Sequence, residues 1–464
     1  MPAGTGVTPA TGGTVVVPRK RRNTELVLLL LALLIGIGAW FITNLNVHNA
    51  IPENWPLVVG IWVGLAAVCH IAIRWRIPYA DPVLLPCVFL LNGLGLAVIA
   101  RLDLSTTSTD APNQFLWTGL GVALFVTVLL VLRDHRPLQR FPFLLGLVGL
   151  VMLLMPLLPG IGREIYGARI WIGIGRLSFQ PAEAAKVVLA VAFASYLVER
   201  REVLALAGVR VLGLDLPRLR DLGPIALMWG ASMLVLVYQR DLGTSLLFFG
   251  MFVMMLYVAT ERPGWAIVGT GLFAVGAVAG WLMFSHVQVR VDAWLHPFDH
   301  PDTAYQIIQG QYGIAWGGLL GRGLGLGRPG LIPVVKSDFI TAAIGEELGM
   351  TGLMAVIMVY ALIAARGLRI SLMGKEPFGK LLAAGLAFTF ALQVFTIVGG
   401  VTRLLPLTGL TTPFLSQGGS SLICNWVLVG LLLVISHQFR KPVATVPEID
   451  PDTERTQLIP GGLR

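Results

Sequence analysis

Two groups of basic residues stand out in a sequence that is otherwise strongly apolar. The first comprises Arg163, Arg169, Arg176 and Lys186, and the second, in the segment 285–337, comprises Arg290, Arg322, Arg328 and Lys336. A guanidinium group presents a planar fork of donors that matches phosphate or carboxylate, so both groups indicate an anionic ligand. The alternative is that these residues pair with lipid headgroups or acidic side chains, and charge alone supports both interpretations about equally.

Acidic residues also fall within or at the ends of long apolar segments, where burial is costly and polar side chains usually face a cavity. Glu183 and Lys186 are three residues apart, so on a helix they share a face and can pair. Asp241 stands at a segment end, and Glu346 adjoins Glu347. We expect some of these residues to act on a ligand and others to hold helices together.

Membrane-spanning helices are the elements expected to position these residues. The 464 residues are 55% hydrophobic and 13% charged, with a mean hydropathy of +0.78, which is too apolar for a water-soluble fold. The apolar blocks have the length, roughly 17–25 residues, of a helix that crosses a bilayer, and they lack the alternation of barrel strands. We expect an all-α polytopic bundle of about twelve spans, at approximately 25–44, 57–75, 83–101, 115–133, 141–159, 182–199, 222–239, 243–260, 265–284, 338–365, 378–400 and 418–438.

Basic residues also predict the orientation of the bundle, because Lys and Arg near span ends are retained in the cytoplasm. If the N-terminus lies inside, 23 of the 34 Lys and Arg residues are cytoplasmic, so both termini are expected there. Attraction to an anionic inner leaflet then accounts for the net charge of +9, and no nucleic-acid partner is expected. The two groups described first and the long loop 285–337 are predicted to lie outside.

Seven motifs follow one another between residues 160 and 438. They are Gly167–Ile172 (GARIWI), Phe179–Glu183 (FQPAE) with Lys186, Gln239–Thr244 (QRDLGT), Gly317–Gly325 (GGLLGRGLG), Ser337–Ile340 (SDFI), Gly345–Gly349 (GEELG) and Leu405–Ser421 (LPLTGLTTPFLSQGGSS). Each motif alone is unspecific, but in this order the set resembles the FtsW/RodA (SEDS) family of peptidoglycan glycosyltransferases. Three positions depart from the family pattern: Ala182 replaces Ser, Arg240 replaces Pro and Gln417 replaces Tyr.

The resemblance implies a division of the chain into four parts. They are a disordered, basic cytoplasmic tail (1–24), N-terminal spans that include an extra pair (25–140), the catalytic membrane core (141–438) and a cytoplasmic C-terminal tail (439–464). The family-type bundle has ten spans, and this chain adds two before the core. Because two is an even number, the sidedness of the core is unchanged.

Members of this family polymerise lipid II, the undecaprenyl-pyrophosphate-linked disaccharide peptide, at the outer face of the bacterial cytoplasmic membrane during elongation or division. A class B penicillin-binding protein, a transpeptidase, is the implied partner. The reaction needs a base for the attacking sugar hydroxyl and cations for the departing pyrophosphate. Carried onto this sequence, the substrate-binding residues are Arg169, Trp171, Gln180, Glu183, Lys186, Asp241, Arg290, Tyr305, Gln306, Lys336, Asp338, Glu346 and Ser420. No metal-ligand spacing is visible, although a divalent cation (Mg or Mn) is compatible with pyrophosphate binding.

The resemblance places the catalytic aspartate early in the long loop, in a D-P-x-G-x-G-Y-Q context. The corresponding segment here is one residue shorter, and alignment on Pro301 puts His300 at that position. A one-residue gap restores Asp299, which is our first choice. Asp302 is the rival, although Pro-Asp-Thr sequences often only begin a turn. His300 is the third candidate, because imidazole titrates near neutrality.

Two other functions compete with polymerisation. A transporter that flips the lipid-linked precursor would also need polar residues inside a membrane cavity. A non-enzymatic scaffold for a partner synthase is the second alternative. Flipping would favour intramembrane acids in both leaflets, whereas most polar residues of the motifs gather on the predicted outer side, which favours an enzyme.

Overall fold

A computed structural model describes residues 20–106, 108–165, 168–174, 177–201, 209–211, 214–216 and 219–442. Nearly all of both predicted tails lies outside these residues. The helices are α1 (Arg22–His48), α2 (Trp55–Arg76), α3 (Leu84–Thr106), α4 (Asp110–Val131), α5 (Pro142–Leu154), α6 (Pro181–Glu199), α8 (Leu219–Tyr238), α9 (Leu242–Thr260), α10 (Gly264–Met283), α11 (Ser285–Leu295), α12 (Pro301–Gly317), α13 (Ile340–Met373), α14 (Pro377–Val401) and α15 (Gly419–Arg440). Short 3₁₀ turns are η1 (Arg136–Arg140), η2 (Met155–Leu157) and η3 (Pro329–Leu331).

The helices confirm the all-α expectation. In the described part of the chain, ten of them are long and apolar enough to cross a membrane, and two shorter apolar helices cover Pro142–Leu157 and Ala226–Tyr238. Together they correspond to the twelve expected spans. This agreement arises because bilayer thickness fixes the length of each apolar block.

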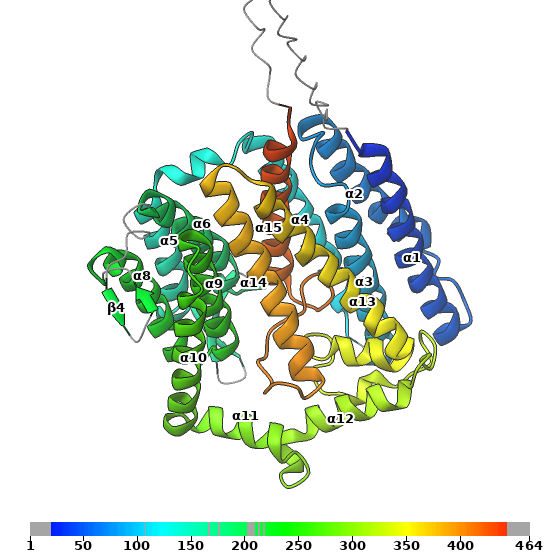
Figure 1. Cartoon of the computed structure of the whole chain (residues 1–464). Coiled ribbons are helices and arrows are strands. Elements are labelled where there is room, and N and C mark those ends of the chain that lie inside the picture. Colours follow the sequence, from blue (N-terminus) through cyan, green and yellow to red (C-terminus); the bar gives the residue numbers. More distant parts are fainter. Residues whose placement is uncertain are drawn as a thin grey trace, which may run out of the picture.

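Four helices form the interior of the bundle: α3, α6, α14 and α15 are the most buried spans, whereas α10 is almost wholly uncovered (Figure 1). Trp426 of α15 is fully buried among the rings of Phe89, Phe125 and Phe414, whose centroids lie 5.4, 5.4 and 5.7 Å away. The edge-to-face geometry of these pairs is the favoured one for buried aromatic rings. Gly121 makes room for the indole, because a Cβ there would approach the Trp426 ring to 2.5 Å.

The first two helices form a pair, in which α1 lies along α3 (Figure 1) and α2 packs against α1 and α4. At one end of α1 a buried polar network joins the pair to the rest: Glu25 contacts Arg22 and lies 2.8 Å from Nδ1 of His70, and Arg22 also donates to the Ala80 carbonyl. The adjoining Asp81 accepts from Arg440 of α15 at 2.7 Å. The pair is therefore joined to the core by buried charges as well as by apolar packing.

Two small antiparallel sheets interrupt the helices and were not expected from the sequence. The first consists of β1 (Gly162–Ile165), β2 (Ala168–Ile174) and β3 (Leu177–Phe179), with Gly162 opposite Ile172 and Ile172 opposite Phe179. The second is the hairpin of β4 (Val209–Val211) and β5 (Leu214–Leu216). The first sheet immediately precedes α6 and carries Arg163 and Arg169 of the first basic group, whereas Lys186 lies on α6 and Arg176 lies outside the described residues.

The segment that corresponds to the long loop is largely helical. Helices α11 and α12 form an arc across the end of the bundle opposite to the start of α1 and the end of α15 (Figure 1). Trp294 of α11 donates to the Arg403 carbonyl at 3.0 Å, and Arg403 Nε donates back to the Trp294 carbonyl at 3.1 Å. These reciprocal bonds fix α11 against the segment that follows α14.

Candidate functional site

A connected set of buried polar side chains occupies the interior of the bundle near the end that α11 and α12 cross. Lys186 of α6 donates from Nζ to Glu183 Oε2 and to Gln393 Oε1, both at 2.8 Å. Gln393 of α14 in turn donates to the Thr411 carbonyl at 2.9 Å. The Lys186 and Glu183 side chains are only 3% and 6% exposed, so each charge depends on the other for compensation.

Asp241 lies next to this set, at the N-cap of α9. Its carboxylate accepts from the backbone N–H of Thr244 at 3.0 Å and from the amide of Gln180 at 3.3 Å. The Gln180 backbone N–H donates to Ser420 Oγ at 3.0 Å, which joins α6 to the first turn of α15. Burial raises the pKa of Asp241 above the usual carboxyl range, against the lowering effect of the Thr244 hydrogen bonds.

Arg290 completes the site from α11, in the arc formed by α11 and α12. Its Nη1 donates to the carbonyls of Leu407 and Thr408 at 3.3 and 3.2 Å. Asp241 and Asp338 are its electrostatic partners: burial lowers the pKa of Arg290, and both carboxylates oppose that change. Burial likewise raises the pKa of Asp338, which accepts from Ser337 Oγ at 2.7 Å.

Gly409 lies between Arg290 and Asp338, and its lack of a side chain leaves room between the two charged groups. Its backbone has φ +73°, and a Cβ there would lie 4.0 Å from both Arg290 Nη2 and Asp338 Oδ2. The conformation is left-handed, which favours glycine over residues that carry a Cβ. We define the central cluster as the residues that meet here, namely Gln180, Glu183, Lys186, Asp241, Arg290, Asp338, Gln393, Gly409 and Ser420.

The segment 402–418 holds the central cluster together, because it contacts elements from all parts of the chain. Ser416 Oγ accepts from the Thr412 N–H at 3.0 Å and donates to the Ser337 carbonyl. Gln417 N donates to the Lys336 carbonyl at 2.8 Å. On the other side, a Cβ on Gly95 of α3 would clash with the Leu415 carbonyl at 2.5 Å. The segment is therefore fixed by close backbone approach as well as by hydrogen bonds.

Lys336 stands apart from the central cluster and is bound by acidic side chains. Its Nζ contacts Asp110 Oδ2, in the first turn of α4, at 2.8 Å, and also contacts Asp103 near the end of α3 and Ser108 between the two helices. Its charge is therefore already compensated in the protein. This contact ties the segment before α13 to α4, next to the position of Asp338.

Glu346 and its neighbour Glu347 bind the glycine-rich run. Glu346 accepts from the Arg328 N–H at 2.6 Å, and Glu347 accepts from the Gly325 N–H at 3.0 Å and from Arg101 Nε at 3.1 Å. The run packs against a break in α13 at Gly349, where the φ angle is +71°. The structure thus makes this run a tight turn packed against α13.

The three candidate bases lie away from the central cluster, around the turn between α11 and α12. The Asp299 side chain is 72% exposed, and its Oδ2 lies 3.7 Å from Nδ1 of His296. His300 is the N-cap residue of α12 and Asp302 belongs to the first turn of that helix. Tyr305 follows on α12 with 48% of its surface exposed.

The remaining predicted residues lie on the flanks of the site. Gln306 donates from Nε2 to the Pro333 carbonyl at 2.9 Å and so holds α12 to the segment before α13. Arg169 and Trp171 lie on β2, where Arg169 is exposed and Trp171 half-buried. Gln393 was not among the residues predicted for the site, yet its fully buried amide bridges Lys186 to the 402–418 segment. A lone glutamine within an apolar span was the available signal, because such residues rarely face lipid.

The described residues form no ready-made metal site. Among them, no group of three or more His, Cys, Asp or Glu side chains is placed to hold a metal ion. The three cysteines, Cys69, Cys87 and Cys424, are buried and unpaired by disulfides.

Comparison with known proteins gives consistent matches. Residues 82–441 match the cell cycle protein family of FtsW, RodA and SpoVE. The chain is 47% identical over 435 residues to the peptidoglycan glycosyltransferase RodA of Mycobacterium tuberculosis, covering 92% of this chain and 93% of that protein.

Two solved structures share the fold. An aspartate-to-alanine mutant of the rod shape determining protein RodA of Thermus thermophilus has a TM-score of 0.57 and 27% identity, covering 78% of this chain and 99% of that one. A chain from a peptidoglycan synthase complex that coordinates polymerisation and crosslinking has a TM-score of 0.55 and 27% identity, covering 85% of this chain and all of that one.

Proposed function

Because the chain belongs to the FtsW, RodA and SpoVE family, we propose that its central cluster binds the pyrophosphate of lipid II during glycan polymerisation. The chain is a multi-pass membrane protein and a peptidoglycan glycosyltransferase. The observation that carries this function is the 47% identity to RodA of Mycobacterium tuberculosis over 92% of the chain. Its similarity to RodA proteins, one of them described as rod shape determining, supports a role in elongation.

Arg290 is the cation that we assign to the departing pyrophosphate. It is held by carbonyl groups rather than by a bidentate carboxylate contact, so part of its guanidinium fork remains available beside Gly409. Asp241 and Asp338 flank it and set its position. Lys186, by contrast, lies deeper and is already paired, so we assign it the role of holding α6 to α14.

Asp299 is our proposed base. The reacting sugars of a lipid-linked substrate lie outside the membrane, beyond the pyrophosphate, and the turn that carries Asp299 is exposed at that end of the bundle. The carboxylate takes the proton of the attacking hydroxyl as the new glycosidic bond forms. The bond from the anomeric carbon to the pyrophosphate oxygen breaks, and undecaprenyl pyrophosphate departs with the electron pair. Substrate binding would desolvate the carboxylate and raise its proton affinity.

We propose a class B penicillin-binding protein as the partner that crosslinks the product. The similarity to a synthase complex in which polymerisation and crosslinking are coordinated supports this choice. We also propose that both termini are cytoplasmic, which the excess of Lys and Arg on that side favours. The outer arc of α11 and α12 then faces the cell wall.

Polymerisation of lipid II by the purified chain tests the function directly. The assay is run in proteoliposomes with and without a class B penicillin-binding protein, and the products are separated by length. We expect glycan strands in both cases and more of them with the partner. Folded protein that makes no polymer even with its partner would contradict the assignment.

A further inference from the structure

The end of α8 carries an arginine where the backbone favours glycine. The Arg240 N–H donates to the Val237 carbonyl at 3.0 Å. The next N–H, of Asp241, donates to the Leu236 carbonyl, also at 3.0 Å. In this arrangement, the Schellman motif, the left-handed residue is usually glycine, because a Cβ is disfavoured there. Here it is Arg240, with φ +60°, so a strained residue adjoins the central cluster and its side chain is a candidate for a function.

Three basic side chains gather between the end of α8 and the start of α11. His286 and Arg290 are four residues apart on α11 and therefore share a face of that helix. Burial and the positive charges of Arg240 and Arg290 lower the pKa of His286, so its imidazole is neutral near pH 7. Positive groups gathered in this way repel one another in the free protein, and an anion bound between them removes that cost. The arrangement therefore indicates an anionic ligand.

The surroundings of His286 leave it able to respond to such an anion. His70 and His135 each place a ring nitrogen 2.8 Å from a glutamate carboxylate. The His286 ring instead lies against the Phe284 ring, with centroids 5.6 Å apart. Of the helices that pack against α11, α10 contains no charged residue, and the Asp302 of α12 follows the opposite end of α11. The two arginines therefore control the protonation of His286 until an anion binds.

Arg240 and His286 also lie at the depth where a lipid-linked phosphate meets water. Helix α8 ends at Tyr238, two residues before Arg240, and α10 ends at Met283, three residues before His286. Only 6% of the apolar window of α10 is buried in the protein, so membrane lipid adjoins this helix. Basic residues at the ends of membrane spans lie at the level of the lipid headgroups.

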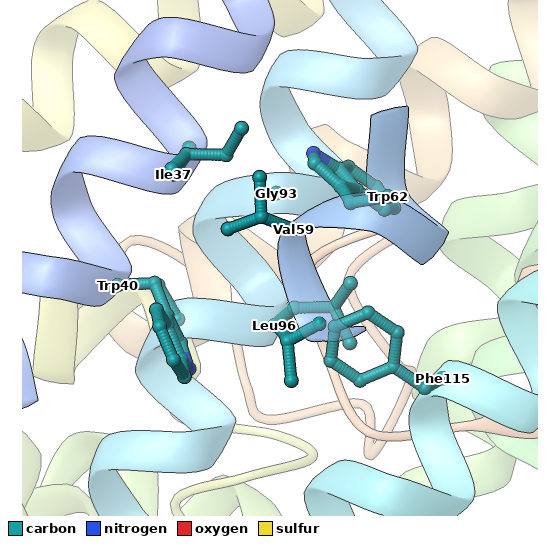
Figure 2. A pocket seen from close by; sticks show the side chains of 10 residues that line it. Ile37, Trp40, Val59, Trp62, Gly93, Leu96 and Phe115 are labelled. Atoms are coloured by element: carbon teal, nitrogen blue, oxygen red, sulfur yellow. The ribbon is translucent and has the colours of Figure 1, made fainter. Parts of the chain in front are cut away.

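The small hollow between α1, α2 and α3 offers no comparable site (Figure 2). It is lined by glycine, aliphatic and aromatic residues, among them Trp40, Trp62, Leu96 and Phe115, and by no charged residue. An anionic group would lose its water there without gaining a cation. The basic residues around the start of α11 are therefore the better site for a lipid-linked anion.

We propose that Arg240 and His286 join Arg290 in binding the pyrophosphate of a prenyl-linked ligand, and that His286 takes up a proton when this anion binds. The inference rests on the proposed binding of the lipid II pyrophosphate by Arg290. Arg240 presents a planar fork of N–H donors to the phosphate oxygens. The negative charge of the ligand favours the imidazolium, so the ring takes a proton from water and donates a charged N–H to the anion. Both residues thereby stabilise the charge of the departing pyrophosphate.

Binding of farnesyl diphosphate, a short prenyl pyrophosphate, tests the role of Arg240. The full chain in phosphatidylcholine nanodiscs is titrated by calorimetry at pH 7 in two buffers of different ionisation enthalpy, which gives the Kd and the number of protons taken up. Arg240→Gly should raise the Kd about tenfold, the effect of one charged donor. Because glycine suits the left-handed backbone, this variant should melt no lower than the unchanged chain. Asn49→Gly is the matched control, since Asn49 has φ +53° at the end of α1, and it should leave the Kd unchanged.

Proton uptake tests the role of the histidine. His286→Gln keeps a hydrogen-bond donor but cannot take up a proton. On binding farnesyl diphosphate, the unchanged chain should therefore take up about half a proton or more beyond this variant. Equal uptake by the two proteins would exclude His286 from the site.

Arg290→Ala separates this inference from the proposed function. If it weakens binding while Arg240→Gly and His286→Gln bind as the unchanged chain does, the two added residues are wrong and the proposed role of Arg290 stands. An unchanged Kd in Arg290→Ala would contradict the proposed function itself.

Farnesyl monophosphate distinguishes a pyrophosphate site from a site for a single headgroup phosphate. It should bind the unchanged chain at least about tenfold more weakly than the diphosphate, because it offers fewer oxygens and less charge to the three basic residues. This difference should shrink in Arg240→Gly. Equal affinity of the unchanged chain for both compounds would overturn the assignment to pyrophosphate.

Discussion

Replacement of Arg290 is expected to weaken polymerisation through the loss of both hydrogen bonds and charge. Hydrogen bonds from a charged donor contribute about 1.5–3 kcal/mol each. One Nη1 atom serves both the Leu407 and Thr408 carbonyls, at 3.3 and 3.2 Å, which is longer than the usual separation. Together they therefore contribute about 2–3 kcal/mol to holding the guanidinium in place, and loss of that much transition-state stabilisation corresponds to roughly a 30- to 160-fold loss of turnover in Arg290→Ala.

Arg290→Ala should also change the pH dependence. Burial raises the pKa of Asp241 and Asp338, and the positive charge of Arg290 partly offsets this change in both. Without that charge both pKa values rise further, so each carboxyl is protonated at a higher pH. The acid limb of the polymerisation profile should therefore move to higher pH.

The assay is lipid II polymerisation between about pH 5 and 9 at equal amounts of inserted protein. Arg290→Lys keeps the charge but not the planar fork, so it should restore the pH profile more fully than the rate. Arg322→Ala is the matched control, because Arg322 belongs to the same outer segment but lies over the exposed Trp316 ring at 4.7 Å. Normal turnover and an unshifted profile in Arg290→Ala would refute the reasoning.

Lys186→Met should destabilise the fold by about 3–5 kcal/mol, because Glu183 is left buried without its partner. Adding Glu183→Gln to this variant should recover most of the lost thermal stability. If the double variant recovers none of it, the two side chains do not stabilise each other. Gly409→Ala should cost about 1–2 kcal/mol through its φ of +73°, seen as a lower melting temperature, whereas an unchanged value would exclude strain there. With the native cysteines replaced, a cysteine at Asp299 should react with an impermeant reagent in intact cells and one at Arg369 should not; the reverse labelling would contradict the orientation.

Hydropathy predicted most of the fold, because the thickness of the bilayer sets the length of the spans. It did not predict the sheet formed by β1, β2 and β3, whose strands are only 4, 7 and 3 residues long and too short to show a reliable alternation. The network of Glu25, His70 and Arg22 was also not predicted, since its members lie on different helices.

At the site, the sequence predicted which polar residues are present but not which residues each of them contacts. The motifs identified Asp241 and Asp338, and the second basic group identified Arg290, which the fold places near both carboxylates. The sequence could not distinguish these residues from Lys336 and Glu346, which make their contacts elsewhere, because partners such as Asp110 are remote in sequence. Local sequence patterns therefore identify candidate site residues, and the packing of elements distant in sequence determines what each residue contacts.

Substitution of Asp299 tests the proposed mechanism most directly. Asp299→Asn retains the shape of the side chain and removes its ability to accept the proton. In lipid II polymerisation by the purified chain, we predict a loss of at least about a hundredfold for Asp299→Asn and a much smaller loss for Asp302→Asn. The opposite order would make Asp302 the base. Full activity of both variants, with His300→Ala inactive, would contradict the assignment in favour of the histidine.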